Sequence, residues 1–253
     1  HVFPALAVAD ELRRAGQSVL WLGTQEGLEA KIVPAAGLPV AWITVHGLRG
    51  KGARRWLTAP FMLLGSLWQA GRVLLRARPR AVLGMGGFVT GPGGFAAWLL
   101  RKPLAIHEQN SVSGLTNRLL APLAQRVMEA FPGSLPARVH PLHTGNPVRG
   151  AIIQVPPPRE RFAHRSGRPR LLVLGGSLGA QALNETVPQA LARLPAEQRP
   201  EVRHQAGTKH IDAARAAYTR AEVTAQVDAF VDDMAAASAW ADLVVCRAGA
   251  LTG

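Results

Sequence analysis

Two glycine-rich turns constrain what this chain can fold into, because each follows an apolar run and precedes a helical pattern. Residues 171–174 (LLVL) lead into residues 175–180 (GGSLGA), and residues 81–83 (AVL) lead into residues 84–87 (GMGG) and 91–94 (GPGG). Glycine lets backbone N–H groups approach a ligand closely, and the next helix directs the positive end of its dipole at it. Such turns bind anions, usually phosphate. One turn in each half of the chain therefore indicates two phosphate-bearing ligands.

Strand-like and helix-like segments alternate along the whole chain. Apolar runs predict strands at 18–22, 40–45, 81–83, 104–107, 126–129, 170–174, 202–205, 223–230 and 242–246. Helical spacing of apolar residues predicts helices at 3–15, 27–36, 58–77, 94–100, 113–124, 178–194, 211–218 and 232–240. This alternation is typical of the α/β class, with a parallel sheet covered by helices on both faces.

A proline-rich stretch from Pro132 to Pro158 is the best candidate for a domain boundary, because proline excludes long regular elements. We expect two doubly wound domains, residues 1–148 and 149–253, the second incomplete. The sequence begins with His1 and ends directly after a strand-like run, so a fragment truncated at both ends is expected. Ligands of open parallel sheets bind beyond the carboxyl ends of the strands, which predicts a cleft shared by the two turns.

The composition is that of a folded globular protein, with 48% hydrophobic and 18% charged residues. The single cysteine, Cys246, excludes a disulfide framework and a cysteine-rich zinc site, and it fits a reducing cytosol. No apolar run approaches the ~20 residues that cross a bilayer, and no signal peptide is recognisable.

The formal net charge of +13 is concentrated in the first 149 residues, where 17 Lys and Arg face 6 Asp and Glu; the remainder has 12 against 10. Such a field attracts nucleic acid, anionic lipid or phosphorylated substrates. A GC-rich genome that uses arginine freely is the alternative, although it does not explain the scarcity of acidic residues in one half. A nucleic-acid-binding module is disfavoured, because the aromatic residues lie in apolar runs and do not alternate with basic ones.

The segment 54–68 combines basic and apolar residues in the pattern of an interfacial membrane anchor. Its basic members are Arg54 and Arg55, and its apolar members include Trp56, Phe61, Leu64, Leu67 and Trp68. In such an anchor, apolar side chains enter the leaflet and basic ones meet anionic headgroups. A helix buried in the domain core is the alternative.

Several motifs occur in a defined order: residues 1–9 (HVFPALAVA), 47–52 (GLRGKG), 84–94 (GMGGFVTGPGG), 107–110 (HEQN), 145–149 (GNPVR), 175–180 (GGSLGA) and 232–234 (DDM). Their order and spacing closely resemble the MurG family of bacterial peptidoglycan glycosyltransferases. The resemblance extends over the whole chain. The motifs taken together are specific for this family, whereas one glycine turn alone would be weak evidence.

The resemblance implies a GT-B fold, in which two Rossmann-like domains face a cleft. Enzymes of this family transfer N-acetylglucosamine from UDP-N-acetylglucosamine to the C4 hydroxyl of the N-acetylmuramyl-pentapeptide of undecaprenyl-diphosphate-linked lipid I. The product is lipid II, and the anomeric centre is inverted. The first domain would bind the acceptor and anionic inner-membrane lipids, and the second the UDP-sugar. The implied location is peripheral, at the cytoplasmic face of the bacterial inner membrane, with no metal, no further cofactor and no nucleic acid.

The resemblance also assigns residues. His1 is the expected general base, because imidazole titrates near neutral pH; helix capping is its alternative, and Glu108 is a second candidate base. Expected donor contacts are Asn110, Arg149, Gly176, Ser177, Gly179, Val231, Ala250, Leu251 and Thr252. Expected acceptor contacts are Gly86, Gly87, Gly93 and Gly94. Close helix–strand packing is the alternative for these four glycines, and core packing for Val231 and residues 250–252.

Two other enzymes stay open as alternatives. Another GT-B lipid-linked sugar transferase would share the architecture. An NAD-dependent oxidoreductase would share the glycine turns, although neither turn gives G-x-G-x-x-G with an acidic residue about 20 positions on. The family's glycine-rich loop before His1 and its donor-binding segment after Thr252 are missing here. We therefore expect the 253-residue chain alone to be inactive, which lipid II synthesis by this chain would contradict.

Overall fold

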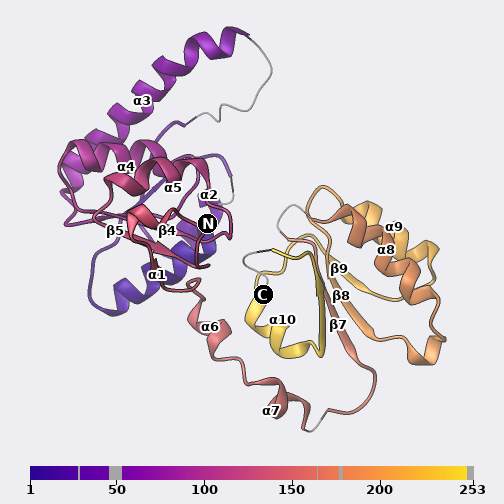
Figure 1. Cartoon of the computed structure of the whole chain (residues 1–253). Coiled ribbons are helices and arrows are strands. Elements are labelled where there is room, and N and C mark those ends of the chain that lie inside the picture. Colours follow the sequence, from indigo (N-terminus) through magenta and orange to yellow (C-terminus); the bar gives the residue numbers. More distant parts are fainter. Residues whose placement is uncertain (28, 46–52, 164, 177–178, 250–253) are drawn as a thin grey trace. The chain divides into compact units, whose positions relative to one another are not determined.

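The computed structural model describes residues 1–27, 29–45, 53–163, 165–176 and 179–249, with the backbone alone described for residues 53–59. The chain forms two compact units, His1–Arg149 and Gly150–Gly253. Each unit consists of parallel strands and helices (Figure 1).

Unit 1 contains a parallel pair of strands and a four-stranded parallel sheet. The pair is β1 (Trp21–Gly23) with β2 (Val40–Trp42). The sheet has the order β3 (Val82–Gly84), β4 (Leu104–Glu108), β5 (Arg126–Glu129) and β6 (Leu142–His143). The helices are α1 (Val2–Arg14), α2 (Glu29–Ala35), α3 (Ala53–Ala77), α4 (Thr90–Leu99) and α5 (Leu115–Leu120), with single 3-10 turns η1 (Ala121–Leu123) and η2 (Ala137–Val139).

Unit 2 contains one four-stranded parallel sheet. Its order is β10 (Leu243–Cys246), β7 (Arg170–Leu174), β8 (Glu201–Gln205) and β9 (Gln226–Asp228). The helices are α6 (Gly150–Ile153), α7 (Pro158–Phe162), α8 (Gln181–Ala192), α9 (Ile211–Arg220) and α10 (Met234–Trp240), with a 3-10 turn η3 (Ala196–Gln198).

The core of unit 1 lies where helices cover the β3-β4-β5-β6 sheet. Leu104 and Ile106 of β4 are buried and pack in one cluster with Ala70 and Leu74 of α3. A Cβ on Gly84 would lie 2.6 Å from Thr90 Cγ2 and 2.7 Å from Ile106 Cδ1, so only glycine lets α4 begin this close to β3 and β4.

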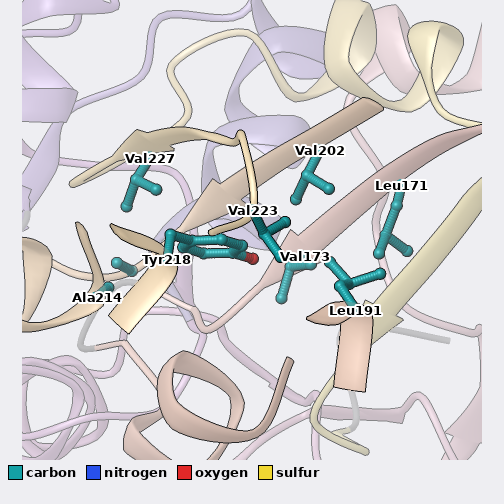
Figure 2. Packing of buried hydrophobic residues seen from close by; sticks show 9 residues of the cluster. Leu171, Val173, Leu191, Val202, Ala214, Tyr218, Val223 and Val227 are labelled. Atoms are coloured by element: carbon teal, nitrogen blue, oxygen red, sulfur yellow. The ribbon is translucent and has the colours of Figure 1, made fainter. Parts of the chain in front are cut away.

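The strands of unit 2 bury both faces, as parallel strands do. Leu171 and Val173 of β7 pack with Val202 and the Tyr218 ring, whereas Leu172 packs on the opposite face with α10. This alternation is the period of two expected for a strand. Figure 2 shows the Tyr218 ring among valine side chains of the first cluster.

The predicted parallel α/β architecture is confirmed, and the bounds of β5 and β7 match those read from the sequence. Several expected elements differ in length. The expected strands 18–22, 40–45 and 223–230 shorten to β1, β2 and β9, because only their paired residues form a ladder. The expected helix 94–100 begins at Thr90, so its glycines lie inside α4. The proline-rich stretch also contains β6, α6 and α7, which were not expected.

Candidate active site

The carboxyl ends of β3 and β4 bring the HEQN motif, the first glycine turn and His1 together in unit 1. His1 precedes α1, and its imidazole Nδ1 is hydrogen-bonded to Oε1 of Gln109. A Cβ on Gly86 would lie 3.0 Å from His1 Cε1, so the ring rests against the glycine turn. His1 makes no side-chain capping bond to α1, and it is exposed. His1 therefore occupies the N-cap position of α1 while its imidazole is engaged by Gln109.

Gln109 holds this arrangement from the end of β4. Its side chain is buried, and its Nε2 donates to the backbone oxygen of His107 at 2.9 Å and lies 3.1 Å from His107 Nδ1. His107 Nε2 lies 3.0 Å from the backbone oxygen of Gly145. Burial lowers the pKa of His107 below its ordinary value, against the opposing effects of the Gly145 hydrogen bond and the Glu108 charge.

Glu108 is a loop organiser in this structure. It has no exposed surface, and its carboxylate accepts hydrogen bonds from the backbone N–H of Asn110 (2.9 Å) and of Gly114 (3.1 Å). It also accepts from the side-chain amides of Asn110 (3.0 Å) and Asn117 (2.9 Å). A general base has to reach the hydroxyl of the substrate. The enclosed carboxylate offers no such access, which argues against Glu108 as an alternative base.

The first glycine turn divides into an open part and a packed part. Gly86 and Gly87 have positive φ angles of 81° and 83°, and a Cβ on Gly87 would meet nothing within 4 Å. Gly93 and Gly94 are buried inside α4, where a Cβ would lie 2.9 Å from Leu22 Cδ2 and 2.7 Å from Leu120 Cδ1, respectively. The missing side chains of Gly93 and Gly94 make room for neighbouring leucines, as the helix–strand packing alternative predicts, and their contact with the acceptor stays a prediction.

The second glycine turn lies between β7 and α8 in unit 2. Gly179 has a φ of 76°, and a Cβ there would lie 2.1 Å from the backbone oxygen of Ala206. Gly175 also has a tightly packed backbone, since its N–H donates to the oxygen of Gln205 at 3.1 Å. Gly176 is exposed, with a positive φ of 79°. Ser177 lies outside the described residues.

The other residues expected to contact the donor lie in different environments. The Arg149 guanidinium lies 4.8 Å from the ring centroid of Phe3, which belongs to α1 directly after His1. Asn110 is tied to Glu108 by its backbone and its amide. Val231 is partly buried against the cluster of Leu172, and its donor contact stays a prediction. Ala250, Leu251 and Thr252 lie outside the described residues.

Helix α3 presents an exposed apolar face in unit 1. Phe61, Leu64 and Trp68 are 75%, 62% and 62% exposed, and the Arg72 guanidinium lies 4.7 Å from the Trp68 ring centroid. Leu67 is instead partly buried against the core cluster, and its membrane contact stays a prediction. The side chains of Arg54, Arg55 and Trp56 lie outside the described part.

From the sequence, no role was assigned to four polar residues that lie in or beside the two glycine turns and the HEQN motif. His107 and Gln109 stand in the HEQN motif and form the contacts to His1, while Asn117 anchors Glu108 from α5. Arg247 follows β10, with Nη2 3.7 Å from the position of a Cβ on Gly176. The motif itself was the available signal for His107 and Gln109; Arg247 reaches its turn through the pairing of β10 with β7.

Within the described residues, no group of three or more His, Cys, Asp or Glu side chains is arranged to hold a metal ion. No helix in this described part is both long enough and apolar enough to span a bilayer.

Comparisons with known proteins agree with the motifs. Residues 1–129 match the glycosyltransferase family 28 N-terminal domain, and residues 170–252 match the glycosyltransferase family 28 C-terminal domain. The chain is 62% identical to the UDP-N-acetylglucosamine–N-acetylmuramyl-(pentapeptide) pyrophosphoryl-undecaprenol N-acetylglucosamine transferase of Alkalilimnicola ehrlichii. It is 61% identical to the transferase of the same name from Nitrosococcus oceani. Each comparison covers all of this chain and 70% of the relative.

Two solved structures support the fold. MurG from Acinetobacter baumannii has a TM-score of 0.72 at 42% identity, covering 100% of this chain and 71% of that one. A UDP-GlcNAc 2-epimerase from Neisseria meningitidis, bound to UDP-GlcNAc, has a TM-score of 0.66 at 10% identity, covering 97% of this chain and 74% of that one. At that identity, the second likeness shows the fold alone.

Two parallel-sheet units, each with a glycine turn that leads into a helix, together with these matches define a glycosyltransferase of the GT-B class. The matches give no support to an NAD-dependent oxidoreductase. The chain belongs to glycosyltransferase family 28, and within it to the MurG family that its motifs resemble.

Proposed function

We propose that this protein transfers N-acetylglucosamine from UDP-N-acetylglucosamine to the C4 hydroxyl of the muramyl sugar of lipid I, giving lipid II. The observation that carries the proposal is the position of His1. Its imidazole lies at the carboxyl ends of β3 and β4, beside Gly86 and the open turn at Gly87. The identity of 62% over the whole chain to a transferase of this name supports the same reaction.

His1 is the general base of this reaction. Its imidazole takes the proton of the acceptor hydroxyl, whose oxygen forms the new bond to the anomeric carbon of N-acetylglucosamine. The bond between that carbon and the β-phosphate oxygen breaks, and its electron pair leaves with UDP. Base catalysis of this kind contributes typically 10²- to 10⁴-fold in rate. Attack from the face opposite UDP inverts the anomeric centre.

Unit 2 binds the donor diphosphate at its glycine turn. The exposed backbone of Gly176, at a positive φ in front of α8, faces the phosphates, and Arg247 beside it supplies a positive charge. Ser177, Asn110, Arg149, Val231 and residues 250–252 complete the expected donor contacts. These groups stabilise charge as UDP departs.

Unit 1 binds the acceptor diphosphate and the membrane. The turn at Gly86 and Gly87 precedes the amino terminus of α4, which favours an anion. The exposed face of α3 suits the surface of an anionic bilayer, because apolar side chains and Arg72 lie on it together. The protein then works as a peripheral enzyme at the cytoplasmic face of the inner membrane, where a lipid-linked acceptor would be reached.

The test is lipid II synthesis by the full-length gene product with radiolabelled UDP-N-acetylglucosamine and a detergent-solubilised lipid I. Labelled lipid II is expected, and His1→Ala should lower kcat about 10²- to 10⁴-fold with little change in the KM of the donor. The matched control is His143→Ala, since His143 is an exposed histidine of β6 in the same unit. No labelled lipid from the unmodified protein would contradict the proposed function, and unchanged kcat in His1→Ala would remove the base assignment.

A further inference from the structure

We infer that Gln109 is a positioning residue that fixes the tautomer of the His1 imidazole, with the hydrogen on Nδ1 and the lone pair on Nε2. The inference rests on the proposed function, in which His1 is the base. It assigns a role to a glutamine that is fully buried. The argument follows the donors and acceptors from the backbone outward to His1.

The backbone oxygen of His107 fixes which way the Gln109 amide points. A main-chain carbonyl can only accept a hydrogen bond, and it lies 2.9 Å from the Gln109 side-chain nitrogen. If the amide were turned over, its oxygen would face this carbonyl and two acceptors would repel each other. The amide nitrogen therefore belongs beside His107, as the hydrogen-bond network requires.

The His107 ring uses the second hydrogen of the same amide. Its Nε2 lies 3.0 Å from the backbone oxygen of Gly145 and has to donate, so Nδ1 of the neutral ring is left to accept from Gln109 Nε2 at 3.1 Å. Burial lowers the pKa of His107 and so favours the neutral ring. The two amide hydrogens of Gln109 are then directed at His107, and the Met85 sulfur, 3.8 Å from the same nitrogen, is a third and weaker acceptor.

The Gln109 oxygen consequently faces His1. It can only accept, and its partner is His1 Nδ1, which must therefore carry a hydrogen. In the neutral imidazole, this leaves the lone pair on Nε2, the nitrogen not engaged by Gln109. A free histidine exchanges between two tautomers, whereas this ring starts in the one that accepts a proton at Nε2.

Among the described residues, the side-chain amide of Gln109 is the direct polar contact of the His1 imidazole. The ring rests on the backbone of Gly86, and the carboxylates of Glu108 and Glu29 act through their charge on the α-amino group of the same residue. The Arg149 guanidinium lies over the Phe3 ring, two residues further along. An uncharged acceptor orients the base without adding a second negative charge beside it.

The first test reads the tautomer directly in the full-length gene product labelled with ¹⁵N-histidine. Proton–nitrogen correlation spectra should show His1, identified by its loss in His1→Ala, with hydrogen on Nδ1 and none on Nε2 near neutral pH. Gln109→Leu should give a mixture of tautomers. Gln125→Leu is the matched control, since the Gln125 oxygen accepts from Leu104 N–H at the opposite end of β4. A His1 tautomer that is unchanged in Gln109→Leu would overturn the inference.

The second test uses the pH dependence of lipid II synthesis. Gln109→Leu should lower kcat between about 10- and 100-fold with unchanged KM values, less than His1→Ala does. It should also move the acidic limb of kcat/KM to lower pH, because the imidazolium loses an acceptor. Gln109→Glu should move that limb to higher pH by about one unit or more, because a carboxylate stabilises the imidazolium.

If Gln109 had a purely structural role, its variants would lose activity without shifting the pH profile in opposite directions. Acidic limbs of kcat/KM that coincide in Gln109→Leu and Gln109→Glu would therefore overturn the inference. The spectra test the tautomer whatever the substrate is. Failure of lipid II synthesis by the unmodified protein would therefore contradict the proposed function, and the tautomer would still be decided by the spectra.

Discussion

The carboxylate of Glu108 illustrates how one residue shapes the loop after β4. It is enclosed and accepts four hydrogen bonds, two from backbone N–H groups and two from asparagine amides. A buried charge is tolerated only when it is hydrogen-bonded in this way. The loop that carries Gln109 and Asn110 is therefore held in place by a residue that the sequence offered as a candidate base.

We expect Glu108→Gln to destabilise unit 1 by about 2–3 kcal/mol, because an amide NH₂ would replace an oxygen that accepts from two of the four donors. Urea unfolding measures this loss. Glu11→Gln is the matched control, since Glu11 is exposed and forms an ion pair with Arg14 on α1, and its effect should stay within about 0.5 kcal/mol. Equal midpoints for the two variants would show that the carboxylate does not organise the loop.

At the scale of elements, α3 has two faces with different neighbours. Ala70 and Leu74 point into the core of unit 1, whereas Phe61, Leu64 and Trp68 are exposed. In Figure 1, the amino-terminal turns of α3 extend beyond α4. No other part of the described unit covers these three exposed side chains, so the outer face of α3 suits a membrane surface. The inner face already packs against the core of unit 1.

We expect Phe61→Ser combined with Trp68→Ser to weaken binding to phosphatidylglycerol vesicles at least about tenfold, because each large apolar side chain contributes roughly 1.5–3 kcal/mol on full burial. Co-sedimentation measures binding. The control combines Ile153→Ser and Leu243→Ser, which are 70% and 61% exposed in unit 2.

Synthesis of lipid II from detergent-solubilised acceptor should survive the α3 changes, because Phe61 and Trp68 lie outside the proposed reacting groups. Vesicle binding that is equal in both pairs of variants would contradict a membrane role for α3.

At the scale of the whole molecule, each unit has its own core, so each responds separately to pH. In unit 2, His204 is buried, and its Nδ1 lies 2.9 Å from the Tyr218 hydroxyl. Burial lowers the pKa of His204 to about 4 from its ordinary value of 6.5. The folded unit therefore binds this proton less readily than the unfolded chain does.

Folding depresses the pKa of His204. The contribution of the neutral, buried His204 to the free energy of unfolding is therefore fully present above about pH 6.5 and is lost as the pH falls to about 4. The expected loss is about 3 kcal/mol in unit 2. Hydrogen exchange of β7 and β8 peptides in urea, measured between these pH values, reports on this unit. The pair His204→Phe and Tyr218→Phe should remove this part of the pH dependence. An unchanged slope in the double variant would show that other groups cause it.

The sequence by itself determined the repeating order of strands and helices, the two glycine turns and the family. These features depend on local propensity and on spacing along the chain, as the matching bounds of β5 and β7 show. It also indicated correctly that some of the glycines pack against helices.

Only the tertiary structure decided which residues face which. Gly93 and Gly94 differ from Gly87 because Leu22 and Leu120 arrive from distant segments, and Leu67 differs from Leu64 because one side of α3 meets the sheet. In the same way, Glu108 is enclosed because Asn117 of α5 packs against it. Gln109 reaches His1 because the fold brings the end of β4 next to the start of α1. Access and hydrogen-bond partners depend on contacts between residues far apart in the chain, and no local pattern encodes them.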